Sequence, residues 1–167
     1  MQRRTLLVRG GLVASVGVTG CLSQFTGGGT REFRPAVQSF TRGLDAFERA
    51  ASTRSAAETR YTDEQWGAAA QRYTAARDGF DAAADEFDSA RSATSGRCVA
   101  VHDRAIRQYR RSLALVEACA HWADAATART SGLDPESDEQ RARVWSGRAA
   151  QYPSASRFDP DQFSCRV

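Results

Sequence analysis

The most regular segment of this sequence is residues 66–90, WGAAAQRYTAARDGFDAAADEFDSA. An aromatic ring recurs in it every seven residues, and an alanine stands three positions after each ring. Four consecutive heptads of this kind are typical of a helix that packs along one seam against a partner helix, and they indicate packing rather than a cofactor site. The rings are Trp66, Tyr73, Phe80 and Phe87, and the alanines are Ala69, Ala76, Ala83 and Ala90.

The residues before this segment predict a first helix over 31–60. Pro35 falls in its first turn, where proline's missing N–H costs nothing. Thr62 and Gln65 form a capping-box pattern, so we expect the second helix to begin near Asp63. The first helix carries one apolar stripe at helical spacing, made of Phe33, Val37, Phe40, Leu44, Phe47 and Ala51.

Two further helices are predicted after the break at 95–96. The third covers about 97–130, and its apolar stripe is Val99, His102, Ile106, Tyr109, Leu113, Val116, Ala120, Ala123 and Thr127. A fourth, shorter helix begins at Asp134-Pro135-Glu136 and runs to about 151, with Val144, Trp145, Ala149 and Tyr152 as its apolar side. Pro153 stops it, and 153–167 is expected to be an irregular tail.

The fold class that follows is all-α. Because the breaks between these long amphipathic helices are short, consecutive helices should lie antiparallel. The sequence therefore predicts one domain over 31–152, an up-down bundle of three long helices and one shorter helix.

Charge argues against a nucleic-acid binder. All 23 basic residues are arginine, and the formal net charge is +3. Arg3, Arg4 and Arg9 precede Cys21, and without them the remaining arginines equal the acidic residues in number. Arginines and carboxylates are interspersed along every predicted helix, whereas a nucleic-acid binder gathers its basic surplus on one face.

The amino terminus has the pattern of an export signal. Arg3-Arg4 precedes Leu6-Leu7 and an apolar, glycine-rich run to Gly20, which is too short to span a membrane. This pair resembles a twin-arginine signal, and Val18-Thr19-Gly20-Cys21 resembles a lipobox. Together with the complete replacement of lysine by arginine, the segment is similar to the lipoproteins of halophilic archaea, although their proteins are usually acidic and this chain after Cys21 is neutral.

This resemblance implies that residues 1–20 are a signal peptide and that cleavage leaves a lipid on Cys21. The protein would then be anchored in the cell membrane and exposed on its extracytoplasmic face. Residues 21–30, which include three consecutive glycines, read as a flexible tether between the lipid and the helical domain.

Cysteine spacing predicts a disulfide, which an extracytoplasmic location permits. Cys98 and Cys119 lie 21 positions apart on one predicted helix, about 30 Å, so they cannot bond each other. We expect Cys98 to pair with Cys165, because that bond would pin the carboxy-terminal tail. Cys119–Cys165 is the alternative.

Two metal sites are weak candidates. Cys98 and His102 share a helix face and, with Cys165, would suit a soft metal. Glu117, His121 and Asp124 also share a face and would suit a divalent cation. The simpler interpretations are a core histidine for His102 and a solvated, ion-paired helix face for the second group.

The sequence shows no phosphate-binding loop, no nucleophile elbow and no lysine for a Schiff base. We therefore expect no enzyme and no cofactor. The favoured function is a non-enzymatic interaction or structural role with a protein partner in the cell envelope. The alternative is a ligand- or metal-binding lipoprotein with a pocket inside the bundle, lined by Trp66, His102, Tyr109 and Trp145.

Overall fold

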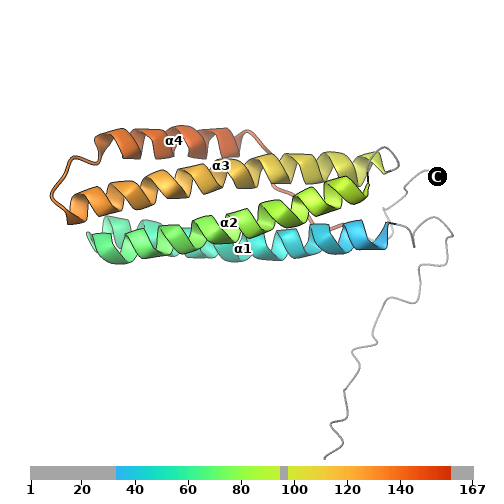
Figure 1. Cartoon of the computed structure of the whole chain (residues 1–167), viewed down its shortest axis with the longest axis horizontal. Coiled ribbons are helices and arrows are strands. Elements are labelled where there is room, and N and C mark those ends of the chain that lie inside the picture. The colour runs from blue at the N-terminus through green and yellow to red at the C-terminus, as the bar shows by residue number, and fades with distance from the viewer. Residues whose placement is uncertain (1–32, 95–97, 159–167) are drawn as a thin grey trace, which may run out of the picture.

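The computed structural model describes residues 33–94 and 98–158, which form an all-α array of four helices. They are α1 (Arg34–Thr62), α2 (Trp66–Ala93), α3 (Val99–Thr130) and α4 (Glu136–Ala150). Successive helices run antiparallel (Figure 1), which confirms the predicted class of three long helices and one shorter one. The predictions for Arg3, Arg4, Cys21 and Cys165 lie outside the described residues.

The heptad seam of α2 is the centre of the core. All four seam alanines are fully buried, and so are three of the four rings, while Trp66 is half-buried. Each buried ring meets an aromatic ring of a neighbouring helix: Phe87 contacts Phe40 of α1 and Phe80 contacts Phe47 of α1. Tyr73 stacks on Trp122 of α3 at 6.0 Å between centroids. The seam predicted from the sequence is therefore confirmed.

The turn between α1 and α2 differs from its prediction. Thr62 is the last residue of α1, and its hydroxyl donates to the carbonyl of Glu58 rather than capping α2. α2 begins at Trp66 with no side-chain cap. The chain reverses instead at Glu64, whose φ is 61°, so the capping-box prediction is wrong because α1 continues through the threonine.

On α3 the predicted apolar stripe is wrong by one residue. The buried heptad positions are Val101, Ala105, Gln108, Ser112, Leu115, Cys119 and Ala126, each immediately before a predicted one. One residue corresponds to about 100° of rotation around a helix. The close approach to α2 takes small side chains such as Ala105 and Ser112, whereas Val99 and Leu113 are 64% and 38% exposed at the edge. Predicting the buried face of α3 from the largest apolar residues therefore gave a stripe along the edge of that face rather than its centre.

The same effect appears on α1 and α4. Ala51 is exposed, and Ala50 is buried in its place because it approaches Gly79 of α2. On α4, Ala149 is buried as predicted, but Val144 is 50% exposed and Ala142 faces the core. Small residues, rather than the largest apolar ones, mark the contact lines between these helices.

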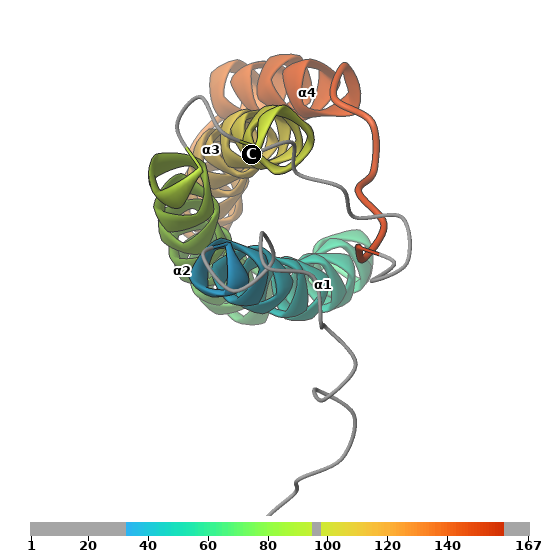
Figure 2. The ribbon, with the colours of Figure 1, turned by 90° about the vertical axis from the view of Figure 1, so that its right-hand side faces the viewer.

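The bundle is open on one side. Each helix packs on the next one along the chain, α1 touches α3 only slightly, and α1 and α4 do not pack against each other. Seen end on, the helices form an arc with its gap between α1 and α4 (Figure 2). α4 covers α3 alone, so it does not complete a closed four-helix core.

The segment after α4 bridges part of this gap. Gln108 of α3 donates to the carbonyl of Pro153 at 2.9 Å. Further on, Arg157 pairs with Asp45 of α1, and the Phe158 ring lies 4.7 Å from that of Phe40. Figure 2 shows this stretch running from α4 down to α1. The residues to 158 form no helix, as expected for the tail, yet they tie α3 to α1.

None of the four helices within 33–94 and 98–158 combines the length and apolar character needed to cross a membrane.

A candidate binding groove between α1 and α4

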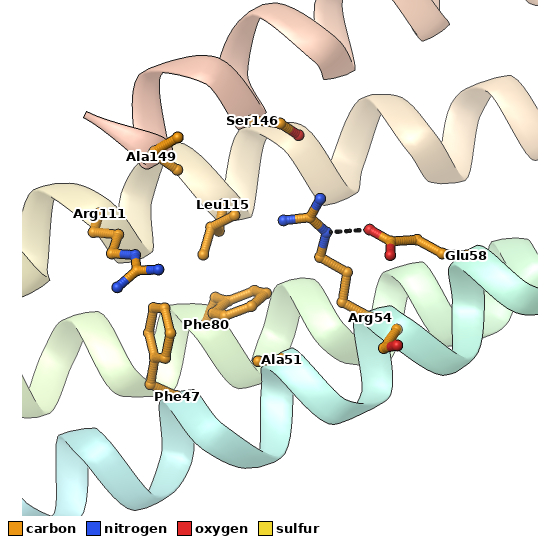
Figure 3. Close-up of a pocket in the computed structure, with 11 residues that line it drawn as sticks. Phe47, Ala51, Arg54, Glu58, Phe80, Arg111, Leu115, Ser146 and Ala149 are labelled. Atoms are coloured by element: carbon orange, nitrogen blue, oxygen red, sulfur yellow. Dashed lines mark ion pairs between the residues drawn. The ribbon is translucent and has the colours of Figure 1, made fainter. Parts of the chain in front are cut away.

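A groove of about 400 Å³ lies between α1 and α4. The backbones of these two helices stay apart, although the Tyr61 hydroxyl of α1 donates a hydrogen bond to Glu139 of α4. All four helices line it (Figure 3), with α1 and α4 as its two sides and α2 and α3 as its floor. A second hollow of about 370 Å³ shares Arg54, Glu58 and Ser146 with it and continues over Tyr73 and Trp122. The two form one elongated depression along the open side of the bundle.

The floor of the groove is apolar. Phe80 of α2 and Leu115 of α3 belong to the buried core and lie directly beneath the groove, and the partly exposed Phe47 of α1 packs beside them. Small residues border this floor, namely Ala51 on α1 and Ala149 and Ala150 on α4. An apolar floor with a few polar groups at its edges is the usual composition of a small-molecule site.

Arg54 and Glu58 form the polar edge on α1. The Nε atom of Arg54 lies 2.9 Å from Oε1 of Glu58, one helical turn away. The geometry is that of an ion pair without an aligned hydrogen bond, so Nε remains without an acceptor. Figure 3 shows this pair reaching across the groove toward α4. The charge of Arg54 is thus compensated, although its hydrogen-bonding capacity is not fully used.

Arg111 of α3 occupies the other end of the groove and has no carboxylate partner among the described residues. Its Nη1 donates to the Ser154 hydroxyl at 3.1 Å, while its Nε is buried and has no acceptor. Burial lowers the pKa of Arg111, because desolvation disfavours the charged form. The guanidinium nevertheless stays protonated at neutral pH, because arginine is not deprotonated in proteins.

Unpartnered polar atoms concentrate in this groove. Five buried side-chain nitrogens or oxygens of the described residues lack a hydrogen-bond partner, and three belong to residues that line it: Arg54, Arg111 and Ser146. Buried polar groups are nearly always satisfied by protein or water. Their gathering at one hollow indicates that the groove holds water or a ligand that supplies acceptors.

The pocket predicted from the sequence is lined by other residues. None of Trp66, His102, Tyr109 or Trp145 borders the groove. Trp66 packs edge-on against Tyr61 at the opposite end of α2 from the connection to α3, and Trp145 is covered by the guanidinium of Arg148. The error follows from the register of α3, since Tyr109 and His102 lie one position away from the buried face.

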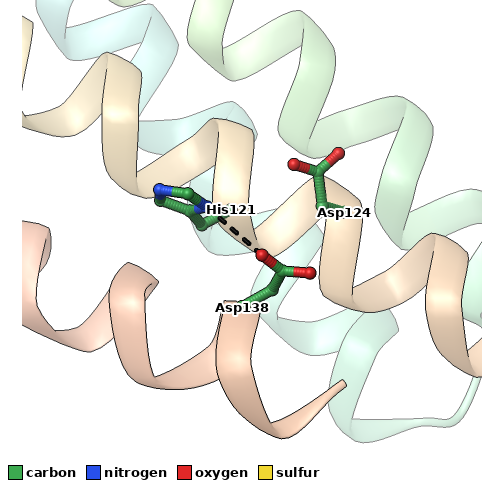
Figure 4. Close-up of side chains that lie close together, drawn as sticks. All are labelled: His121, Asp124 and Asp138. Atoms are coloured by element: carbon green, nitrogen blue, oxygen red, sulfur yellow. Dashed lines mark ion pairs between the residues drawn. The ribbon is translucent and has the colours of Figure 1, made fainter. Parts of the chain in front are cut away.

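A group of possible metal ligands lies between α3 and α4. His121 Nδ1 is 3.4 Å from Oδ1 of Asp138, and Asp124 offers a third ligand atom within 4.8 Å of both (Figure 4). Two members of the predicted set are therefore brought together, Glu117 is outside the group, and Asp138 was missed. Asp138 lies on α4, so only the packing of α4 on α3 reveals it. The Asp124 side chain is exposed, and the group is shallow.

At the other candidate metal site, Cys98 and His102, the cysteine is not available as a thiolate ligand. Cys98 is disulfide-bonded, and Nδ1 of His102 lies 3.1 Å from the carbonyl oxygen of Arg91. Cys119 is a free, buried thiol, so the alternative Cys119–Cys165 bond is not formed. Cys165, the preferred partner of Cys98, lies outside the described residues. The structure therefore gives Cys98 a structural role rather than a ligand role.

No pattern in the amino-acid sequence predicted the groove itself. Phe47 and Ala51 belong to the predicted stripe of α1, but Arg54 and Glu58 read as an ordinary ion pair on a solvated face. Arg111 reads as one of many surface arginines. The groove exists because the α4 backbone packs on α3 and stays away from α1. No local sequence pattern predicts this arrangement.

Comparison with models of protein families, with curated proteins and with solved structures gave no match for this chain.

Proposed function

We propose that this protein is an exported, lipid-anchored binding protein without enzymatic activity, which takes a ligand in the groove between α1 and α4. The observation that carries the proposal is the groove, because it pairs an apolar floor with buried polar atoms that have no hydrogen-bond partner among the described residues. The signal-like residues at the amino terminus support the location, with Cys21 as the site of the lipid.

The polar groups of the groove suit holding rather than converting a ligand. Arginine guanidinium groups remain protonated at neutral pH and donate several hydrogen bonds in a fixed plane. Such groups bind and orient an anion, whereas proton transfer needs groups that titrate near the operating pH. The carboxylate at the groove, Glu58, is held in an ion pair with Arg54.

Location and binding are tested separately. Cell fractionation should place the wild-type protein with membranes, and Cys21→Ser should release it or stop its processing. A protein that stays membrane-bound and processed after Cys21→Ser would contradict the lipid anchor. This result would leave the groove untouched, because Cys21 precedes the tether and the helices.

Binding is tested on the anchored protein after extraction from membranes in neutral detergent. Ala51→Trp would fill the groove from its exposed α1 edge, and Ala82→Trp on the exposed face of α2 is the matched control. Native mass spectrometry should find a bound compound or protein in wild type and in Ala82→Trp but not in Ala51→Trp. A protein instead of a small molecule would favour the interaction role in the envelope. If nothing is retained by any variant, the binding role is wrong.

A further inference from the structure

We propose that the ligand of this groove is a small organic anion, whose apolar body rests on Phe47, Phe80 and Leu115 and whose anionic head is held by Arg111. This inference rests on the proposed binding function and adds the chemical class of the ligand.

The argument begins with the unusual position of Arg111. Arginines that link one part of the described structure to another generally meet a carboxylate there: Arg42 pairs with Glu86, Arg129 with Glu139, and Arg157 with Asp45. Arg111 is less exposed than these three arginines, yet among the described residues it contacts only the Ser154 hydroxyl and the face of the Phe47 ring. A desolvated cation without a counter-charge is destabilising, and an anion in the groove would remove that cost.

The geometry leaves part of the guanidinium free for this anion. Nη1 is engaged by Ser154 and Nε is closed off from solvent, whereas Nη2 makes no hydrogen bond with the described residues. A carboxylate or phosphate oxygen accepts from guanidinium N–H groups with favourable planarity and charge. Figure 3 shows the Arg111 side chain directed into the hollow beside Phe47, with Leu115 and Phe80 farther along. An anion seated there would be followed directly by apolar surface.

The far end of the groove does not favour a second anionic group. Glu58 lies at that end and compensates Arg54, so the end is close to neutral. The buried Ser146 hydroxyl, which has no partner, would accept or donate one hydrogen bond there. The volume of about 400 Å³ lies within the range of about 300–1,000 Å³ that is usual for small-molecule sites. One charged head on one apolar body therefore fits best.

The test compares three probes that share one apolar body: 2-naphthoate, neutral 2-naphthol and cationic 2-naphthylmethylammonium. Each is titrated by fluorescence into the full anchored protein in neutral detergent. We expect 2-naphthoate to bind at least tenfold more tightly than 2-naphthol, and the cation to bind most weakly. Arg111→Gln should weaken the anion at least tenfold, about 1.4 kcal/mol, and change 2-naphthol less than twofold.

Arg110→Gln is the matched control, because Arg110 is exposed on the same helix and does not line the groove. It should bind 2-naphthoate like wild type, and circular dichroism should show equal helicity in both variants. Equal binding of naphthoate and naphthol to wild type, or an Arg111→Gln variant with wild-type affinity, would overturn the anion assignment.

The failure of this inference is distinguishable from failure of the proposed function. If no naphthalene probe binds but a retained compound or protein is lost in Ala51→Trp, the groove binds something other than a small organic anion. If no probe binds and nothing is retained, both proposals are wrong.

Discussion

The guanidinium of Arg111 on α3 lies over the Phe47 ring of α1, 5.0 Å from its centroid. These two helices otherwise meet little, because α2 stands between them for most of their length. The contact therefore joins the two helices across the floor of the groove and fixes the position of the cation at its end. Both side chains line the groove, so the contact sets where the cation lies in the site.

Replacing Arg111 by methionine should leave the free energy of unfolding unchanged within about 1 kcal/mol or raise it. Methionine keeps the apolar stem, and the variant removes a desolvated charge while losing one partly exposed hydrogen bond and a cation–π contact. Urea unfolding followed by circular dichroism measures the change. Arg129→Met, which removes one of the two arginines that pair with Glu139, should be destabilising. If Arg111→Met is the less stable of the two, Arg111 is a structural residue.

Two glycines predict opposite effects of the same substitution. A Cβ at Gly79 of α2 would lie 2.9 Å from Cβ of Ala50 on α1. Neither methyl group can rotate away, so the two helices would have to move apart. Gly79→Ala should therefore cost about 1–3 kcal/mol of overpacking, partly offset by about 1 kcal/mol of helix propensity. A Cβ at Gly147 of α4 meets nothing within 4 Å, so Gly147→Ala should stabilise by about 0.5–1 kcal/mol. Thermal unfolding compares them. A stabilised Gly79→Ala would mean that α1 and α2 are farther apart.

Glu139 predicts a pH-dependent contribution to stability. It is largely buried, and burial raises the pKa of its carboxyl, but hydrogen bonds from Tyr61 and Arg129 outweigh this and lower the pKa overall. A carboxylate whose pKa is lower in the folded state stabilises above its unfolded pKa of about 4.3, and this contribution is lost as the pH falls through the folded value. Glu139→Gln should therefore be destabilising at pH 7.

The difference in unfolding free energy between wild type and Glu139→Gln should shrink below about pH 4, where both side chains are neutral. Asp81→Asn, on the exposed face of α2, is the control and should show no comparable loss at pH 7. Urea unfolding at a series of pH values measures both. A difference that is constant from pH 7 to pH 3 would show that the Glu139 charge contributes nothing.

Cysteine chemistry gives a further prediction. Cys119 is fully buried, and burial raises the pKa of its thiol to about 12, so the reactive thiolate is nearly absent at pH 8. Iodoacetamide should leave the native protein unmodified and add one group after unfolding in guanidinium without reductant. Reduction should expose two more thiols if Cys98 pairs with Cys165 and Cys21 carries the lipid. Mass spectrometry counts the groups.

Labelling of the native protein at pH 8 would contradict the burial of Cys119. Three groups in the unfolded, unreduced protein would contradict the disulfide, and a mapped Cys98–Cys165 peptide pair would establish it.

Local sequence patterns predicted the helices because the buried face and the ends of a helix depend largely on nearby residues. The heptads of α2 identify a buried seam, and the chain ends α3 where Gly132 takes a φ of 70°, a conformation that glycine adopts without strain. The stripe of α3 was misplaced by one residue because its seam is made of Ala105, Gln108 and Ser112, whose burial depends on how closely α2 approaches. Gln108 is buried and satisfied by the carbonyl of Pro153, 45 residues away.

Helix periodicity, breaks and composition are local properties, so the amino-acid sequence alone was enough to predict a row of amphipathic helices. The packing of α4 on α3, with its backbone away from α1, is established only when the chain folds. This packing opens the groove, where Arg111 has no carboxylate partner among the described residues, and it brings Asp138 to His121. These relationships join residues far apart in the chain, and they depend on packing between whole helix faces rather than on any short stretch of residues.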